Sequence, residues 1–430
     1  MTKNATCEIS TSLKMSGLFL VLALLYFGVL LSRNAVLFST DNNLGQNAAF
    51  QWALRSGGFM GWGDSPLVGN GGMIPPSLTS LLNEKLPLVF FTNWIHAIYM
   101  SGASIFLGLF LRRSGLRIVA IVMTGLVAFW LSTNVTLVYS GHTGKYGVLF
   151  FMMMALWCIQ KAIRNESSAW AVLAGGAMGM ALLEQQDVAL FMGIFWAAYA
   201  IHVIVREKGW NWILLVKRLV PMAVVALWIA GPASLIQLQF QTKDVGVAGG
   251  ETPEAKWEFA TQWSQAPDES IGFIAPGYMG WRSGEPDAPY WGRLGRSAGW
   301  EKSRQGFMNF KLDDWYLGAI PVVLAIFALF YAWKGKPAGL EMSAADAPDG
   351  EWRIRRQEVL FWGITALVAL LLAFGKYFPL YVIFYQLPVV SSIRNPVKFL
   401  HVFQVAMGIL AAYGVDGAIR WSESGAKEKA

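Results

Sequence analysis

Long apolar runs separated by short polar segments dominate this chain. About ten of the runs are close to 20 residues long, which is the length that an α-helix needs to cross about 30 Å of hydrocarbon. They lie near residues 15–37, 87–111, 117–139, 146–163, 168–183, 188–205, 213–240, 315–333, 357–375 and 398–419. The pattern predicts an all-α polytopic membrane protein with about 10 transmembrane helices.

Composition supports this class of protein. Hydrophobic residues make up 55% of the 430 residues and charged residues only 14%, which is more apolar than a soluble domain of this size requires. The first run is longer than the apolar core of a signal peptide, and Ser32-Arg33 provides no small-x-small cleavage site, so we expect a retained helix. Cys7 and Cys158 imply no disulfide framework and no metal-ligand spacing.

The net charge of +7 is explained by membrane topology better than by nucleic-acid binding. If the N-terminus is cytosolic, the basic residues gather in the cytosolic loops, as the positive-inside rule requires. These residues are Arg112, Arg113, Arg117, Lys161, Arg164, Arg206, Lys208, Lys217, Arg218, Lys334, Lys336, Arg353, Arg355, Arg356, Arg420, Lys427 and Lys429. We therefore expect both termini in the cytosol of a plasma (inner) membrane protein, with the active face periplasmic or extracellular.

The polar segments divide this predicted transmembrane domain, which spans residues 1–430, into recognisable parts. Residues 38–86 form a first outer loop, and residues 241–314 form a second outer region that is rich in aromatic side chains. Residues 334–356 form a cytosolic loop, and residues 376–397 read as a re-entrant or interfacial helix followed by a turn. Loops as long as the two outer ones are usually functional or disordered.

Asp41 is the first candidate for chemistry, because it follows the first apolar run directly. A carboxylate in a partly desolvated cavity can act as a general base toward a hydroxyl group, or can bind a metal. The alternative is structural. Residues 44–56 read as a short amphipathic helix, and Thr40, Asp41 or Asn42 each has a side chain suited to its N-cap.

Three further polar clusters fall on the same predicted side of the membrane. His142 and Lys145 lie in Gly141–Tyr146 and either bind a phosphate at a helix start or belong to a plain polar turn. The segment 184–187, Glu-Gln-Gln-Asp, is either a functional intramembrane site or a tight hairpin. Arg394 suits bidentate phosphate binding but also suits an interfacial anchor.

Together these motifs resemble the YfhO-like membrane proteins, which are similar to the GT-C glycosyltransferases. The resemblance rests on an acid after the first run, a Gly- and Pro-rich first outer loop, Gly-His before the fourth run, and two aromatic motifs. Its most specific part is the stretch Leu-Pro-x4-Ile-Arg-Asn-Pro-x-Lys-Phe at 387–399. The first loop reads Thr-Asp-Asn and lacks the paired acids of some relatives, so no metal site or other cofactor is predicted, although a divalent metal is compatible with the fold.

The resemblance implies transfer of a sugar from a polyprenyl-phosphate donor to an envelope glycan or protein on the outer face. Asp41 matches the essential acid of the first outer loop. Arg394, and after it His142 and Lys145, match the cationic groups that hold the donor phosphate.

Three aromatic residues in the outer segments are candidates for stacking on sugar rings: Trp62, Tyr290 and Trp291. The expected partners are the lipid-linked donor, membrane lipids and the acceptor, with no nucleic acid. Two other functions fit the same sequence. One is a transporter or flippase of lipid-linked intermediates, which requires broken or charged helices near the midplane. The other is a non-catalytic scaffold that uses the aromatic second outer region as an interface.

Overall fold

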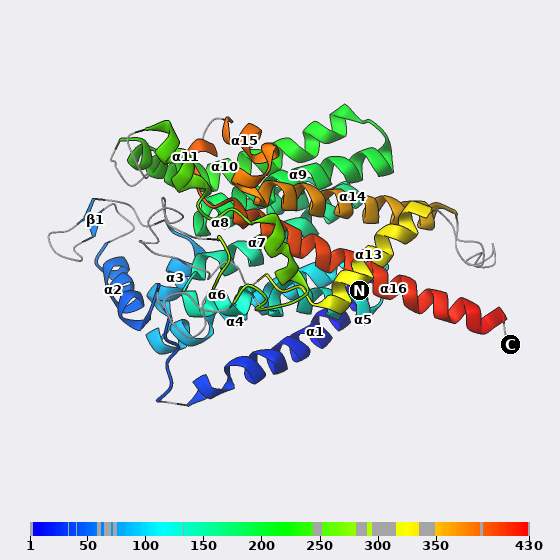
Figure 1. Ribbon diagram of the computed structural model, residues 1–430, viewed down its shortest axis with the longest axis horizontal. Helices are drawn as coiled ribbons and strands as arrows, with labels where there is room; N and C mark the ends of the chain where they lie inside the picture. The colour runs from blue at the N-terminus through cyan, green and yellow to red at the C-terminus, as the bar shows by residue number, and fades with distance from the viewer. Residues whose placement is uncertain are drawn as a thin grey trace. The chain divides into compact units, whose positions relative to one another are not determined.

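The computed structural model describes residues 3–32, 34–39, 41–57, 62–63, 70–71, 75–131, 133–243, 252–280, 290–294, 315–334, 349–387 and 390–428. Within these residues all regular secondary structure is helical, apart from one antiparallel pair of two-residue strands, β1 (Trp62–Gly63) and β2 (Asn70–Gly71). The all-α class predicted from the hydropathy pattern is therefore confirmed (Figure 1).

In the part of the chain that the structure describes, eight segments are long and apolar enough to cross a membrane: Ser12–Leu31, Leu88–Arg113, Ile118–Ser140, Thr143–Arg164, Gln186–Lys208, Trp212–Ile236, Arg355–Ala373 and Pro396–Glu423. Two shorter apolar helices cover Ser168–Glu184 and Ala319–Trp333. Each predicted run overlaps one of these segments, so the coarse pattern of an integral membrane protein with multiple apolar helices holds.

The helices group into two compact units, each described by itself. The first unit comprises Met1–Phe110 and Asn134–Lys243, and the second comprises Leu111–Thr133 and Asp244–Ala430. The first contains α1 (Lys3–Phe27), η1 (Gly28–Leu31), α2 (Leu44–Arg55), α3 (Leu78–Lys85), most of α4 (Leu88–Arg113), α6 (Thr133–Ser140, apart from its first residue), α7 (Thr143–Arg164), α8 (Ser168–Glu184), α9 (Gln186–Lys208) and α10 (Trp212–Lys243). Within it, α8 packs against both α7 and α10 (Figure 1).

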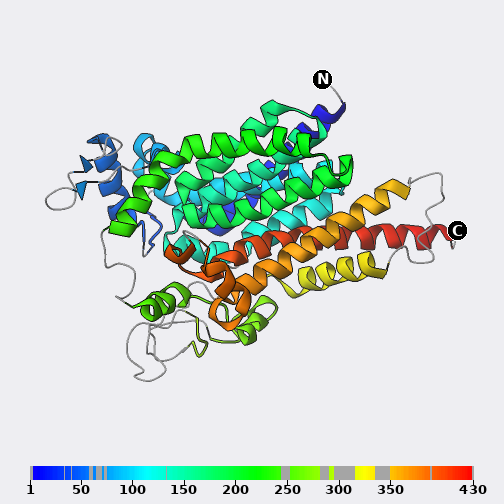
Figure 2. The same ribbon diagram turned by 90° about the horizontal axis from the view of Figure 1, so that it is seen from above.

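The second unit contains α5 (Ile118–Gly125), the π-helical turn η3 (Leu126–Trp130), α11 (Pro253–Thr261), η4 (Pro267–Phe273), α13 (Ala319–Lys334), α14 (Asp349–Ala373), η5 (Gly375–Tyr377), α15 (Pro379–Tyr385), η6 (Val390–Ser392), η7 (Pro396–Phe399) and α16 (Leu400–Glu428). Helices α13, α14 and α16 pack side by side (Figure 2). The predicted interfacial helix at 376–397 is a series of short helices, η5 to η7. Residues 349–356, predicted as loop, are the first turns of α14.

The first membrane helix ends earlier than its apolar sequence predicts. Helix α1 ends at Phe27, a 3-10 turn follows, and residues 35–39 are not helical. The buried side chain of Asn93 in α4 replaces the lost helical bonds. Its Oδ1 accepts from the amide of Leu37 at 2.9 Å, and its Nδ2 donates to the carbonyl of Ala35 at 3.1 Å. An apolar backbone segment can leave the helix here because its polar groups remain paired.

The third predicted run is interrupted. Helix α5 passes into the π-helical turn η3, and Leu131 is extended before α6 begins at Thr133. A π-turn changes the register of the helical hydrogen bonds. The buried Gln404 of α16 compensates, because its Nε2 donates to the carbonyl of Val127 at 3.1 Å.

Candidate functional site

Asp41 is held by its backbone at the end of the first membrane segment. Its amide donates to the carbonyl of Ser140, the last residue of α6, at 3.1 Å. The Ser39 hydroxyl donates to the Asp41 carbonyl at 2.8 Å. The position of the acid is therefore set by contacts that leave its carboxylate uninvolved.

Gly141 is the residue that allows this close approach. Its φ is +79°, and a Cβ built there would lie 1.4 Å from the Asp41 carbonyl oxygen. The next residue, Asn42, completes the contact, because its Nδ2 donates to the Gly141 carbonyl at 2.6 Å. The Asp41 segment thus packs against the Gly-His pair noted in the sequence, and only glycine fits at position 141.

The carboxylate of Asp41 faces the imidazole of His142. Asp41 Oδ2 lies 3.5 Å from His142 Nε2, and the two side chains are 63% and 31% exposed. The N-cap of α2 is Asn43, which forms a capping box with Gln46, so the predicted cap at Thr40, Asp41 or Asn42 is wrong. A solvent-facing carboxylate can accept a proton. The imidazole beside it can relay that proton or stabilise the charge of the carboxylate.

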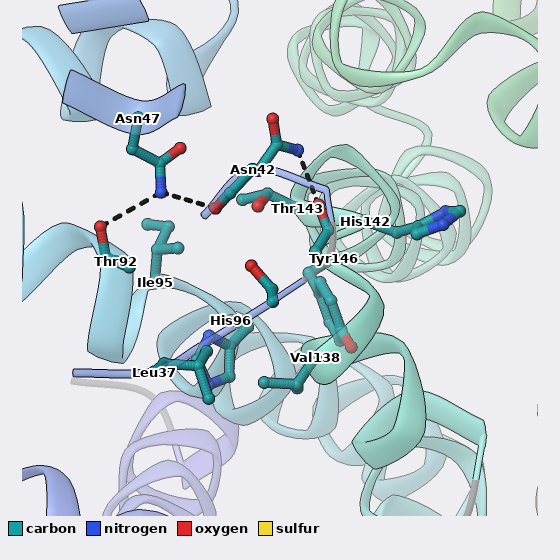
Figure 3. A pocket seen from close by; sticks show the side chains of 12 residues that line it. Leu37, Asn42, Asn47, Thr92, Ile95, His96, Val138, His142, Thr143 and Tyr146 are labelled. Carbon is teal, nitrogen blue, oxygen red and sulfur yellow. Dashed lines mark hydrogen bonds between the residues drawn. The ribbon is translucent and has the colours of Figure 1, made fainter. Parts of the chain in front are cut away.

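A polar pocket lies behind this pair, between the first loop, α4 and the start of α7 (Figure 3). Its lining comprises Leu37, Ser39, Asn42, Asn47, Thr92, Ile95, His96, Val138, Gly141, His142, Thr143 and Tyr146. The cavity inside these walls has a volume of about 10 Å³, which is room for about one water molecule. The pocket therefore does not enclose a lipid-linked sugar.

Side-chain amides and hydroxyls organise the pocket walls. Asn47 Nδ2 donates to the Asn42 carbonyl at 2.9 Å and to Thr92 Oγ1 at 3.1 Å. His96 is buried, and its Nε2 has no hydrogen-bond partner within the described part of the chain. The imidazole of His142 projects away from the other lining side chains (Figure 3), and its Nε2 lies 3.5 Å from Asp41 Oδ2.

Lys145 differs from His142 although both were predicted to bind the donor phosphate. It lies in the first turn of α7 and is buried, with 2% of its surface exposed. His142 is therefore the more accessible of the two, and a phosphate role for Lys145 remains a prediction.

Glu184 connects to the same region from the end of α8. Its Oε1 accepts from the amide of Thr79 in α3 at 2.9 Å, and its side chain lies against Gly147 in α7. In the sequence this acid belongs to the segment read as a hairpin turn or an intramembrane site. The signal that points to its contact is the spacing of Gly144 and Gly147, which leaves one face of the start of α7 without side chains.

Arg394 lies in the second unit. Its side chain is exposed, and its guanidinium lies 5.2 Å from the centre of the Phe259 ring. The following segment is fixed to the end of α11 and the residues after it. The Asn395 amide donates to the Ala260 carbonyl at 2.8 Å, and the Val397 amide to the Trp263 carbonyl at 3.0 Å. The arginine thus projects from an anchored turn.

The predicted sugar-stacking residues differ in accessibility. Tyr290 is 2% exposed, and its hydroxyl donates to Glu269 Oε2 at 2.5 Å and accepts from the Leu294 amide at 2.9 Å. Its ring offers no open face. Trp291 is 55% exposed and lies 5.7 Å from the ring of Tyr278. Trp62 forms part of β1, and its side chain lies outside the described residues.

Within the described ranges, no group of three or more His, Cys, Asp and Glu side chains is placed to hold a metal ion. In comparisons with known proteins, the chain matches no protein-family model and no curated protein significantly.

Proposed function

We propose that this protein is a membrane glycosyltransferase of the GT-C type, which moves a sugar from a polyprenyl-phosphate donor to an envelope acceptor. The observation that carries the proposal is the solvent-facing Asp41 carboxylate, which lies 3.5 Å from the His142 imidazole, beyond the non-helical residues that follow the first membrane segment. The apolar helices give a lipid-linked donor a route to this site from the bilayer.

The proposed reaction assigns one role to each charged group. Asp41 accepts the proton of the acceptor hydroxyl, and the hydroxyl oxygen forms a bond to the anomeric carbon of the sugar. The bond between that carbon and the phosphate oxygen breaks, which releases polyprenyl phosphate. Arg394 stabilises the negative charge on this leaving group, as a planar guanidinium does for phosphate. Trp291 supplies an exposed ring for the sugar.

The decisive experiment measures release of polyprenyl phosphate from labelled polyprenyl-phosphate sugars by the full chain in lipid bilayers. Asp41→Asn keeps the size of the side chain but removes the base, and general base catalysis typically contributes about 10²–10⁴-fold. We expect a loss of that order. Glu84→Gln is the matched control, because Glu84 is also an acid of the first outer loop but pairs with Lys85 at 2.7 Å.

Arg394→Ala tests the second role in the same assay. Loss of one charged phosphate contact should lower kcat/KM by at least about tenfold. Arg394→Lys keeps the positive charge but not the planar guanidinium, so its kcat/KM should fall less. Full activity in both Asp41→Asn and Arg394→Ala with an identified donor would refute the proposed mechanism.

A second candidate, transport of a lipid-linked intermediate, is favoured by two observations. The third membrane segment is interrupted at η3 and Leu131, and α10 contains Pro221 and Pro232. Interrupted helices are common at transport sites near the bilayer midplane. Single cysteines placed along Leu126–Ser140 in a variant lacking Cys7 and Cys158 would distinguish the two. Labelling by a water-soluble thiol reagent from both faces indicates transport, and labelling from one face indicates the transferase.

A further inference from the structure

Glu184 contacts two elements that lie far from it in the sequence. It is the last residue of α8, and the extended Gln185 separates it from α9. Its Oε1 accepts from the Thr79 amide at 2.9 Å. Thr79 lies in the first turn of α3, where amides lack helical partners and favour negative charge. The Thr79 hydroxyl in turn lies 3.0 Å from the Tyr99 hydroxyl of α4.

The opposite side of Glu184 lies against α7. A Cβ on Gly147 would come within 2.6 Å of the Glu184 Cδ, and a Cβ on Gly144 would come within 2.8 Å of the Glu184 carbonyl oxygen. Any side chain at position 147 would therefore push the carboxylate away from Thr79. The glycines of α7 and the acid of α8 fit together as one contact.

The contact of Glu184 with α3 and α7 affects the Asp41–His142 pair, because His142 adjoins α7 and Asp41 belongs to the same loop as α3. His142 is the N-cap of α7, and Gly141 beside it receives the Asp41 carbonyl. Helix α3 belongs to the same first outer loop as Asp41. Glu184 thus contacts the helix that carries the imidazole and the loop that carries the carboxylate.

We infer that Glu184 is a positioning residue for the Asp41–His142 pair, holding α3 and the start of α7 in the arrangement that keeps the two side chains together. Its catalytic consequence rests on the proposed function, but the arrangement itself does not. The competing interpretation is that Glu184 is an ordinary polar residue of a tight turn. Asp187 in the same turn is an example of such a residue, because its Oδ1 accepts from amides of its own turn, including the Val188 amide at 2.7 Å.

Hydrogen exchange of the full chain in lipid nanodiscs tests the inference without any activity. Glu184→Ala should increase amide exchange at least tenfold in peptides covering both 78–82 and 141–147. Glu184→Gln retains an acceptor oxygen for the Thr79 amide and should stay within about threefold of wild type, as should Asp187→Asn. Unchanged exchange at 141–147 in Glu184→Ala overturns the inference. So does an increase spread evenly over all helices, which would indicate general destabilisation.

Gly147→Ala provides a second, independent test. Alone it should reproduce the exchange of Glu184→Ala, because its methyl group displaces the carboxylate. In the Glu184→Ala background the methyl group enters vacated space, so the double variant should be no worse than either single variant. Additive effects of the two substitutions would show that Gly147 and Glu184 act separately, and would overturn the inference.

If transfer activity is present, Glu184→Ala should lower kcat with little change in KM, and Glu184→Gln should restore most of it. A protein without transfer activity from any donor would remove the proposed function, while the exchange measurements would still decide the role of Glu184. If Glu184→Ala shows the expected increases in amide exchange but leaves kcat unaltered, Glu184 has only a structural role. That result would refute the inference that it positions the pair.

Discussion

At the scale of single residues, the sequence identified Asp41 and His142 but not their pairing. Hydropathy and loop position single out an acid after the first span and a His before the fourth. Their contact depends on Gly141, whose role becomes visible only when Asp41 lies on it. A contact between distant loops has no local signature, because local propensities describe only neighbouring residues.

Gly141→Ala tests the importance of this contact. The substitution places a methyl group at a φ of +79° and within 1.4 Å of the Asp41 carbonyl oxygen. The segment must move, so we expect a loss of about 2–4 kcal/mol in the free energy of unfolding and a loss of any activity that needs Asp41. Gly176→Ala in α8 is the control, because no atom lies within 4 Å of its added Cβ; it should be neutral or stabilising by about 0.5–1 kcal/mol. Denaturation in detergent measures both.

A pH-dependent contribution is expected from Glu166, in the turn between α7 and α8. Lys208 Nζ lies 2.5 Å from its Oε1, and this hydrogen bond lowers the pKa of the Glu166 carboxyl. A lowered pKa in the folded state stabilises the protein above the ordinary pKa, which is about 4.3, and the effect is lost as the pH falls through the lower, folded value. Thermal unfolding of Glu166→Gln should therefore differ from wild type at pH 7 and converge with it only once the pH falls below the lowered pKa of the folded state. A constant difference across that range would contradict this assignment.

At the scale of elements, the described membrane segments were predictable and their interruptions were not. An apolar run of about 20 residues has few alternatives to a helix, because a lipid-exposed backbone must satisfy its own hydrogen bonds. The early end of α1 and the π-turn in the third segment depend on Asn93 and Gln404, which lie on other helices. In their own sequence context Asn93 and Gln404 look like any other polar residues, so the sequence does not show that they bind another segment.

Asp416 of α16 joins three helices in the second unit. Its side chain is fully buried; Oδ2 accepts from Arg355 of α14 at 2.6 Å and from Arg420 at 2.7 Å, while Oδ1 accepts from the amide of Arg117 at 3.3 Å. Asp416→Asn should reduce the free energy of unfolding by about 3–5 kcal/mol, because the arginines lose their counter-charge. Glu423→Gln, which removes an exposed acid bound to Arg117, should cost less than about 1 kcal/mol. Equal losses would show that burial does not set the difference.

The two neighbouring aromatics of the second outer region should behave in opposite ways. Tyr290→Phe leaves the buried Glu269 carboxylate without its phenol donor and should destabilise the protein by about 1–3 kcal/mol. Trp291→Ala should leave stability within about 0.5 kcal/mol but weaken binding of a sugar-bearing donor. Unfolding curves and donor binding, measured on the same preparations, check both. If Tyr290→Phe is as stable as wild type but binds the donor more weakly, Tyr290 contributes to sugar binding and not to stability.

At the scale of the whole molecule, the chain was predicted as one transmembrane domain, and its helices group into two compact units. One of the three points at which the chain passes between the units lies in the interrupted third segment, at Thr133 and Asn134. Hydropathy cannot reveal such a grouping, because it assigns each span but not its neighbours. The candidate residues divide accordingly: Asp41, His142 and Glu184 belong to the first unit, and Arg394 and Trp291 belong to the second.

Gly141 and the two α7 glycines Gly144 and Gly147 also have a consequence for genetics. Membrane helices usually accept exchanges among small and apolar residues, so a saturation library of this chain should tolerate most such changes within α7. Gly141, Gly144 and Gly147 should instead form a ladder of intolerance with a period of three, since each abuts backbone or the Glu184 side chain. A growth-based screen that shows this ladder would confirm that these three positions accept no added side chain.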